Sequence, residues 1–424
     1  MSVYQKAGWV SALLLYFTCS CRAQVTQPLS LDQAMSEAVA SNLNLIAERY
    51  NLSVAEARII TARLRPNPIF TVEGDHLDLL GTGYNKINQA GPTEYSVRTD
   101  FILERGGKRD NRIAVAENNK EVVAAQLQNT VRQLVLDVQS AFVDVLQARD
   151  NLILARENLD AFTQIVGVNE TRVRAGDLAD VELLRTQLAQ LQFENSVRQA
   201  GLRLATAQSK LRLLIGRKTN DPSFQAAGDL RKDTAAVNRE LVRQQALRLR
   251  PDLQAIVRDQ ARSTAELRLQ IAQGKVDYTV GSEVRRQQGL AGRGNSLGFF
   301  FSTNLPVFNR NQGEIERARQ EQQQLEARYR TLQAVIENDV DTAYAQYEIA
   351  RNTVERIEST MLTKARDVRQ ITEYSYRRGE ATFVEFLDAT RAYNETIQSY
   401  NEARAEYART LYLLDSVAGK VANP

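Results

Sequence analysis

The chain has 424 residues, with 54 basic and 51 acidic side chains and a formal net charge of only +3. The charges are interleaved, and no block of lysine and arginine marks a nucleic-acid surface, so we expect no nucleic-acid partner. Only 8 prolines and 21 glycines interrupt long tracts rich in alanine, glutamine, arginine, glutamate and leucine, a composition typical of long helices and coiled coils.

The first 23 residues have the pattern of a secretory signal. An apolar run from Trp9 to Phe17 follows one basic residue and is too short to span a bilayer. We expect cleavage after residue 23. A lipoprotein signal with the acyl chain on Cys19 or Cys21 stays open as the alternative. These are the two cysteines of the chain, so no structural disulfide is expected.

The remainder contains an internal repeat. Gly176 falls on Gly379 at an offset of 203, and a slip of one position places Ala141-Phe142 over Ala343-Tyr344. Two copies of one structural unit follow from this self-similarity. We expect a first unit at residues 24–220, a linker at 221–238 and a second unit at 239–424.

Each unit contains a long tract in which apolar or small residues recur at steps of three and four, the heptad pattern of a coiled coil. In the first unit the tract from Lys108 to Arg174 predicts a rod of roughly 100 Å at 1.5 Å per residue. Gly176 and Gly379 then reverse the chain, and helices follow at about Asp177 to Ile215 and Thr382 to Val417. Two long helical hairpins are expected, with their tips at these glycines.

Shorter helices are expected at about Leu31 to Arg63 and Arg239 to Gln273, with Pro251 marking a kink or break. Four segments of alternating apolar and polar residues precede the long helices, at 69–77, 94–102, 276–284 and 297–305, and each pair is joined by a glycine-rich loop. Their length suits tilted transmembrane strands. Four strands leave unpaired edges that are very costly in lipid, so closure requires other copies. The alternative is a small soluble sheet that caps the helices.

The junctions between strands and long helices resemble the TolC family of outer-membrane efflux proteins, over essentially the whole mature chain. The motifs that carry the resemblance are Glu104-Arg-Gly-Gly-Lys-Arg-Asp-Asn-Arg112, Leu305-Pro-Val-Phe-Asn-Arg-Asn-Gln-Gly-Glu-Ile315 and Arg65-Pro-Asn-Pro68. They are similar to the branch that serves cobalt-zinc-cadmium efflux.

The resemblance implies a mainly α fold with a small β part, in which three protomers close a twelve-stranded barrel above an α-helical tunnel. It also implies a homotrimer in the outer membrane, in contact with its lipid and extending into the periplasm. The implied partners are a periplasmic adaptor and an inner-membrane resistance-nodulation-division pump.

The hairpin tips are the candidate control points. Glu385 and Asp388 lie three residues apart on one helix face, and threefold symmetry would turn them into acidic rings that concentrate cations. The family places its periplasmic constriction, with paired acidic positions, at this part of the sequence. Glu182 and Arg185 hold the corresponding places in the first unit. The alternative is an ordinary solvated helix face.

The residues around the two glycines form the expected adaptor-docking surface, with plain turn chemistry as the alternative. These residues are Arg174, Gly176, Asp177, Arg378, Gly379 and Glu380.

No catalytic pattern is present in the sequence. His76 is the only histidine, so neither a histidine-based triad nor a histidine cluster for metal is available. We expect no enzyme activity, no cofactor and no metal site, and a passive conduit for solutes such as metal cations or drugs. The competing class is a soluble or surface-attached periplasmic coiled-coil interaction protein.

Overall fold

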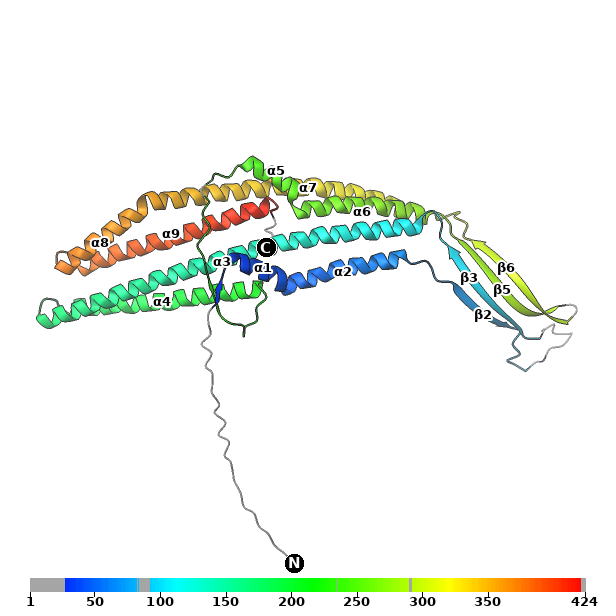
Figure 1. The fold of residues 1–424 in the computed structure, drawn as a ribbon, viewed down its shortest axis with the longest axis horizontal. Helices are drawn as coiled ribbons and strands as arrows, with labels where there is room; N and C mark the ends of the chain where they lie inside the picture. The colour runs from blue at the N-terminus through cyan, green and yellow to red at the C-terminus, as the bar shows by residue number, and fades with distance from the viewer. Residues whose placement is uncertain (1–26, 82, 84–91, 234, 290–291, 421–424) are drawn as a thin grey trace, which may run out of the picture.

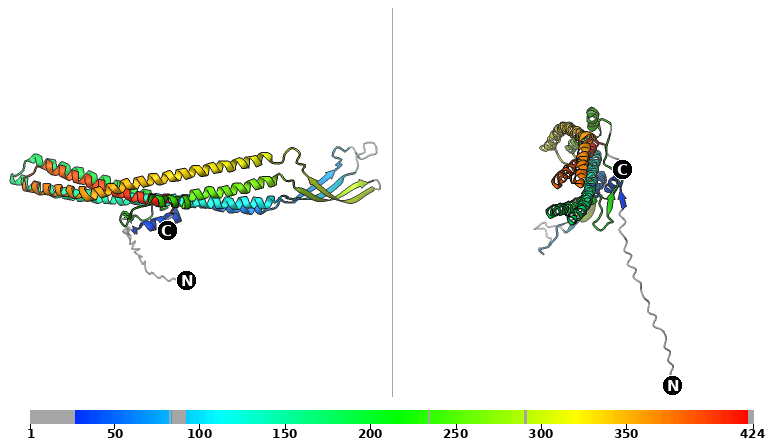
Figure 2. Two further views of the ribbon diagram at one scale, coloured as in Figure 1. Left: turned by 90° about the horizontal axis from the view of Figure 1, so that it is seen from above. Right: turned by 90° about the vertical axis from the view of Figure 1, so that its left-hand side faces the viewer.

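A computed structural model describes residues 27–81, 83, 92–233, 235–289 and 292–420. The molecule is a long rod of helices with a four-stranded sheet at one end and two hairpin tips at the other (Figure 1). Seen from the end, the long helices line up as a curved layer (Figure 2). The expected signal segment, with Cys19 and Cys21, lies outside the described residues, as do most of the first predicted glycine-rich loop and residues 290–291 of the second.

The two predicted hairpins are confirmed. Their helices are α3 (Lys108–Ala175) with α4 (Asp180–Leu214), and α7 (Gln312–Arg356), η1 (Ile357–Met361) and α8 (Leu362–Arg378) with α9 (Phe383–Val417). Gly176 and Gly379 end α3 and α8 with φ angles of 80° and 81°. After each glycine the next backbone N–H also bonds back into the last helical turn. This arrangement needs a left-handed residue, which is why glycine stands at both tips.

The predicted continuous helix from Leu31 to Arg63 is wrong in one respect, because it is two helices, α1 (Leu31–Ser41) and α2 (Leu43–Arg63). Asn42 separates them: its side-chain oxygen accepts from the backbone N–H of Leu45 and so caps α2. In the second unit the predicted break at Pro251 is confirmed, since α5 (Arg239–Leu249) ends there and α6 (Pro251–Gln273) begins with this proline.

The second long helical segment contains one turn that the first lacks. Between α7 and α8 the chain forms a π-helical turn, η1, and the helix bends near this point (Figure 1). A π turn accommodates one extra residue in a helix. The slip of one position in the sequence repeat falls between Tyr344 and Gly379, the stretch that contains η1. The insertion is thus absorbed within the helix.

Two sheets connect the units. Strands β1 (Gln27–Leu29) and β4 (Phe224–Ala226) pair in parallel, so part of the expected linker at 221–238 packs on the first unit. The larger sheet has the order β2-β3-β5-β6 and is antiparallel throughout. Its strands are β2 (Ile69–Asp75), β3 (Glu94–Leu103), β5 (Tyr278–Gly289) and β6 (Gly292–Thr303). The β3–β5 pair joins the two units, and β2 and β6 are the outer strands of this sheet.

The larger sheet has one apolar and one charged face. One cross-strand row of the apolar face consists of Val72, Val97, Val284 and Leu297. On the other face Arg98 pairs with Asp100, and Arg285 pairs with Glu283, Glu73 and Glu94. This alternation suits a barrel wall with lipid outside and water inside.

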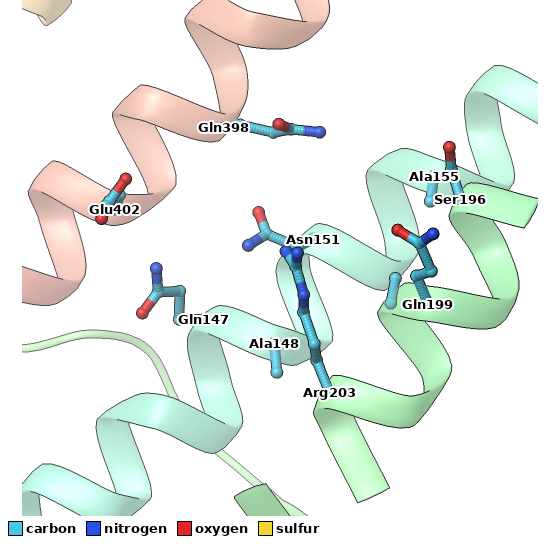
Figure 3. Close-up of a pocket in the computed structure, with 10 residues that line it drawn as sticks. Gln147, Ala148, Asn151, Ala155, Ser196, Gln199, Arg203, Gln398 and Glu402 are labelled. Atoms are coloured by element: carbon cyan, nitrogen blue, oxygen red, sulfur yellow. The ribbon is translucent and has the colours of Figure 1, made fainter. Parts of the chain in front are cut away.

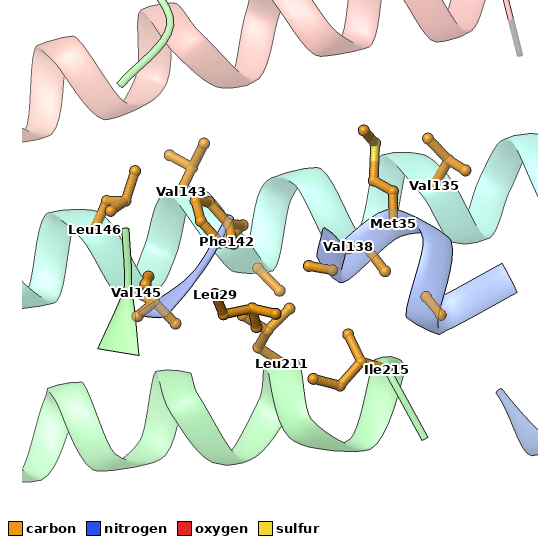
Figure 4. Close-up of a cluster of buried hydrophobic side chains, with 14 of the residues drawn as sticks. Leu29, Met35, Val135, Val138, Phe142, Val143, Val145, Leu146, Leu211 and Ile215 are labelled. Atoms are coloured by element: carbon orange, nitrogen blue, oxygen red, sulfur yellow. The ribbon is translucent and has the colours of Figure 1, made fainter. Parts of the chain in front are cut away.

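Each unit has its own apolar core at mid-length of the rod. In the first, Leu29, Val138, Phe142, Leu211 and Ile215 pack between β1, α3 and α4 (Figure 4). In the second, side chains of α5, α7 and α9 form the equivalent cluster. These cores hold each hairpin in place at the end opposite its tip.

Candidate functional site at the hairpin tips

An aromatic cluster joins the two hairpins near their tips. Phe162 of α3 lies 5.6 Å from Phe386 of α9 between ring centroids, and Tyr376 of α8 stacks on Phe386 at 5.2 Å. Ile165, Ala189 and Phe383 complete the buried group. Aromatic pairs of this kind contribute about 0.5–1.5 kcal/mol each beyond their buried area. The tips are therefore held together by a contact of their own.

Asn169 adds a polar tether beside this cluster. Its Nδ2 donates to Thr186 Oγ1 of α4 at 2.9 Å and to Tyr376 Oη of α8 at 2.7 Å. Asn169 and Thr186 are fully buried and Tyr376 is 4% exposed. Burial raises the pKa of the Tyr376 hydroxyl, so it stays neutral at physiological pH. Among the described residues the Asn169 Oδ1 has no hydrogen-bond partner, which leaves the tether only partly satisfied.

A polar pocket separates this tip contact from the cores. It has a volume of about 350 Å³ and lies between α3, α4 and α9, lined by Gln147, Asn151, Arg203, Gln398 and Glu402 among others (Figure 3). Near it side-chain bonds cross between the hairpins, from Asn401 Nδ2 to Asn151 Oδ1 at 2.9 Å and from Arg409 Nη2 to Gln147 Oε1 at 2.7 Å. The lining offers amides and one charge of each sign, with no nucleophile beside a base. The pocket makes the tip contact a distinct unit from the mid-rod cores.

Glu385 and Asp388 are both exposed on the first turns of α9, as the sequence predicts, but their surroundings differ. The Glu385 carboxylate accepts from the backbone N–H of Thr382 at 2.7 Å and from its hydroxyl at 2.9 Å. These bonds close a capping box and hold the pKa of Glu385 below its ordinary value. Asp388 has no hydrogen bond or ion pair to any described residue. Of the two carboxylates, Asp388 is thus the one that no described residue engages.

The corresponding pair of the first unit carries no net charge. Arg185 donates to Glu182 at 2.8 Å across one turn of α4. The N-cap of α4 is Ala179, which has no side-chain oxygen, whereas the corresponding N-cap of α9 in the second unit is Thr382. The repeat therefore places a neutral ion pair in one hairpin and two carboxylates in the other.

The six predicted docking residues all lie exposed around the two reversals. Arg174 is 3.8 Å from Glu170, and Arg378 is 3.6 Å from Glu380, both as open surface pairs. A Cβ at Gly176 would meet nothing within 4 Å, whereas one at Gly379 would lie 3.4 Å from the Arg172 guanidinium of the other hairpin. The Gly379 reversal is thus the one that touches its neighbour.

Neither a metal centre nor a spanning helix is found in the described part of the chain. No group of three or more histidine, cysteine, aspartate or glutamate side chains there is arranged to hold a metal ion. None of the described helices is both long and apolar enough to cross a membrane.

Residues 34–217 and 242–420 match the Outer membrane efflux protein family, one match in each predicted unit, and the chain belongs to this family. It is an outer-membrane efflux channel and not an enzyme, and the family acts as trimers with a periplasmic adaptor and an inner-membrane pump. The predicted fold, function, partners and location are thereby confirmed. The alternative of a soluble interaction protein is set aside.

Known relatives are distant in sequence but span nearly the whole chain. The cobalt-zinc-cadmium resistance protein CzcC of Cupriavidus metallidurans is 24% identical over 394 residues, which cover 93% of this chain and 90% of CzcC. Among solved structures, CusC has a TM-score of 0.73 at 20% identity and covers 99% of this chain and 95% of its own. The Campylobacter jejuni outer membrane channel CmeC has a TM-score of 0.74 at 11% identity, covering 92% and 85%.

Proposed function

We propose that this channel exports metal cations and that Asp388 sets its preference for cations at the periplasmic tip. The observation that carries the proposal is the contrast between the two acidic positions of α9. Glu385 is engaged in the helix cap, whereas Asp388 is exposed and unpaired among the described residues. The relationship to a protein named for cobalt, zinc and cadmium resistance supports metal cations as the cargo.

The size of the effect follows from Coulomb's law. A monovalent cation about 4 Å from a carboxylate in water is stabilised by about 1 kcal/mol. Three copies of Asp388 around a narrow opening would then bias local occupancy by roughly tenfold or more at low salt, and less at high salt because of screening. A divalent cation gains more.

The test is ion selectivity of the trimer in planar lipid bilayers. Asp388→Asn should lower the ratio of cation to anion permeability several-fold. Glu395→Gln, an exposed carboxylate two turns further along α9, is the matched control and should change the ratio less. Equal effects of the two substitutions would rule out a special role for Asp388.

We further propose that neighbouring protomers meet along exposed apolar stripes of α4 and α8. Val181, Leu184, Leu188 and Leu191 of α4 are 52–64% exposed in the single chain, at the steps of three and four that a coiled-coil seam requires. On α8, Ile371 and its exposed apolar neighbours form a second stripe. In a head-to-tail ring this α8 stripe would pack against the α4 stripe of the next protomer. Leu188→Glu should reduce the yield of trimer on size-exclusion chromatography in detergent, while Gln192→Glu adds the same charge one turn further along at the flank of the stripe and should reduce it less.

The two reversals are our proposed docking points for the adaptor. Gly176 permits a clean test because space around it is open, and asparagine tolerates its left-handed backbone. Gly176→Asn should weaken adaptor binding with an unchanged trimer yield. Normal binding by this variant would leave turn formation as the sole role of Gly176.

A further inference from the structure

At the end of the larger sheet next to the long helices, the side chain of Arg105 stacks on the apolar face of the sheet. The Arg105 guanidinium carbon lies 4.3 Å from the centroid of the Tyr278 ring, and Tyr278 lies 5.2 Å from Phe301 between ring centroids. Tyr278 is in register with Leu103 and shares its face with Val280 and Phe301. Arg105 therefore covers the last row of the lipid-facing surface, on the periplasmic side where α3 and α6 meet the strands (Figure 1).

Positive charge is in excess around this row. Three cations here have carboxylate partners: Lys108 with Asp277 at 2.7 Å, Arg112 with Glu104 at 2.7 Å, and Arg63 with Glu117 at 3.2 Å. Five others form no ion pair with any described residue, namely Arg65, Arg105, Arg109, Lys275 and Arg310. A surplus of unpaired guanidinium and ammonium groups favours an anionic partner.

Lys275 lies next to Arg105 in space although 170 residues separate them in sequence. A Cβ built on Gly106 would come within 2.5 Å of the Lys275 Cδ, so the lysine side chain crosses the glycine that follows Arg105. Gly106 has a φ of +73°, which suits glycine at this reversal. The chain thus brings Lys275 of the second repeat against the backbone beside Arg105 of the first.

An exposed apolar loop lies beside these cations. Leu305, Val307 and Phe308, which follow β6, are 79%, 61% and 91% exposed. Leu305 and Phe308 line an open pocket of about 480 Å³ together with Lys275 and Lys108. Apolar side chains next to unpaired cations at the end of a transmembrane surface match the region where lipid acyl chains meet their headgroups.

We propose that Arg105, Lys275 and Tyr278 bind the phosphate of an anionic phospholipid in the periplasmic leaflet of the outer membrane, with Leu305 and Phe308 against its acyl chains. Arginine suits this role because its planar fork can hold two phosphate oxygens, and stacking on Tyr278 fixes its plane. Three such sites ring the trimer. The inference rests on the outer-membrane location and is independent of cargo and of the tip.

The test uses the full-length trimer, exchanged in detergent against equal amounts of phosphatidylglycerol and phosphatidylcholine, with retained lipid counted by native mass spectrometry. Near an anionic surface each cation is worth about fivefold in binding, so wild type should retain phosphatidylglycerol in preference. Arg105→Gln/Lys275→Gln should abolish the preference. Lys364→Gln, an exposed cation on α8 far from the sheet, is the control and should keep it.

Two further arms identify the ligand. Phe308→Ser keeps every charge and should still reduce retention, because acyl-chain contact is lost, and excess inorganic phosphate should not displace the lipid. An unaltered preference in the double variant would overturn the proposal. So would displacement by free phosphate, which would mean a simple anion site. A Phe308→Cys thiol that resists maleimide labelling in the trimer, because a second copy covers it, would also overturn the proposal. Ion selectivity should be unchanged in all these variants, which separates this test from that of Asp388.

Discussion

Replacement of Tyr376 by phenylalanine should loosen the tips without disturbing the rest of the rod. The Asn169 Nδ2 uses one hydrogen for Thr186 and the other for Tyr376. Phenylalanine keeps the ring that stacks on Phe386 but removes the acceptor. Asn169 is fully buried, so the freed N–H cannot reach water while the hairpins are together. When they separate, water satisfies it.

An unsatisfied buried donor costs about 1–3 kcal/mol. This penalty applies only to the joined arrangement, so it shifts the ratio of joined to separated tips by about tenfold for each 1.4 kcal/mol. If three tips of a trimer separate together, a shift of roughly a thousandfold results. The loss of one hydrogen bond in each protomer should therefore cause a large increase in the fraction of trimers whose tips are separated.

Single-channel recording in planar bilayers measures this shift as the fraction of time spent in high-conductance levels. The matched control is Tyr374→Phe, whose hydroxyl accepts from Arg378 at 2.7 Å at an exposed position, where such a bond contributes little. Tyr376→Phe should increase the high-conductance fraction and Tyr374→Phe should not. A Tyr376→Phe trimer with wild-type conductance and stability would refute the role given to the Asn169 tether.

Three further predictions concern the middle of the rod. Hydrogen bonds from Lys232 hold the pKa of Glu358 in η1 below the ordinary 4.5, so their stabilisation is present above that pH and is lost as the pH falls through the lower native value. The difference in Tm between wild type and Glu358→Gln should accordingly shrink and vanish as the pH falls below the native pKa of Glu358, and a constant difference would contradict this cause. Gly216→Ala, where φ is +76° and a Cβ would lie 2.3 Å from a carbonyl oxygen of α1, should lower the free energy of unfolding by at least about 2 kcal/mol. Gly201→Ala, inside α4 with open space around it, should raise it by about 0.5–1 kcal/mol, and denaturant titration compares the two. Deletion of Thr360 should remove the π turn and leave the facing of α8 unchanged, so high-conductance openings should stay at the wild-type level; an increase would show that the π turn itself is needed for the tip contact.

The sequence reveals the hairpins because their causes are local. A reversal at Gly176 or Gly379 requires a left-handed residue, and heptads repeat within each helix. The repeat also signals η1, through the slip of one position. One helix start that the prediction lacks is equally readable, Asn42 before Leu43, whereas the predicted start at Thr382 is explained by its capping box with Glu385.

Other features depend on partners far away in the chain. Asn169 looks like a polar interruption of a heptad, and its role follows only from residues 17 and 207 positions away. The strands predicted at 276–284 and 297–305 instead run over 278–289 and 292–303, because pairing register, and not local alternation, decides where strands end. The pairing of β1 with β4 brings together three-residue strands that carry no pattern of their own.

The outer strands β2 and β6 also dictate how the channel must be made. A single chain that entered the bilayer would expose one row of backbone donors and acceptors on each of these edges to hydrocarbon, and each unsatisfied group costs several kcal/mol there. Membrane entry and assembly are therefore one thermodynamic event. The yield of channels should vary with the third power of protomer concentration when that concentration is low. A modest fall in synthesis would then remove most of the channels, while unassembled chains remain outside the bilayer.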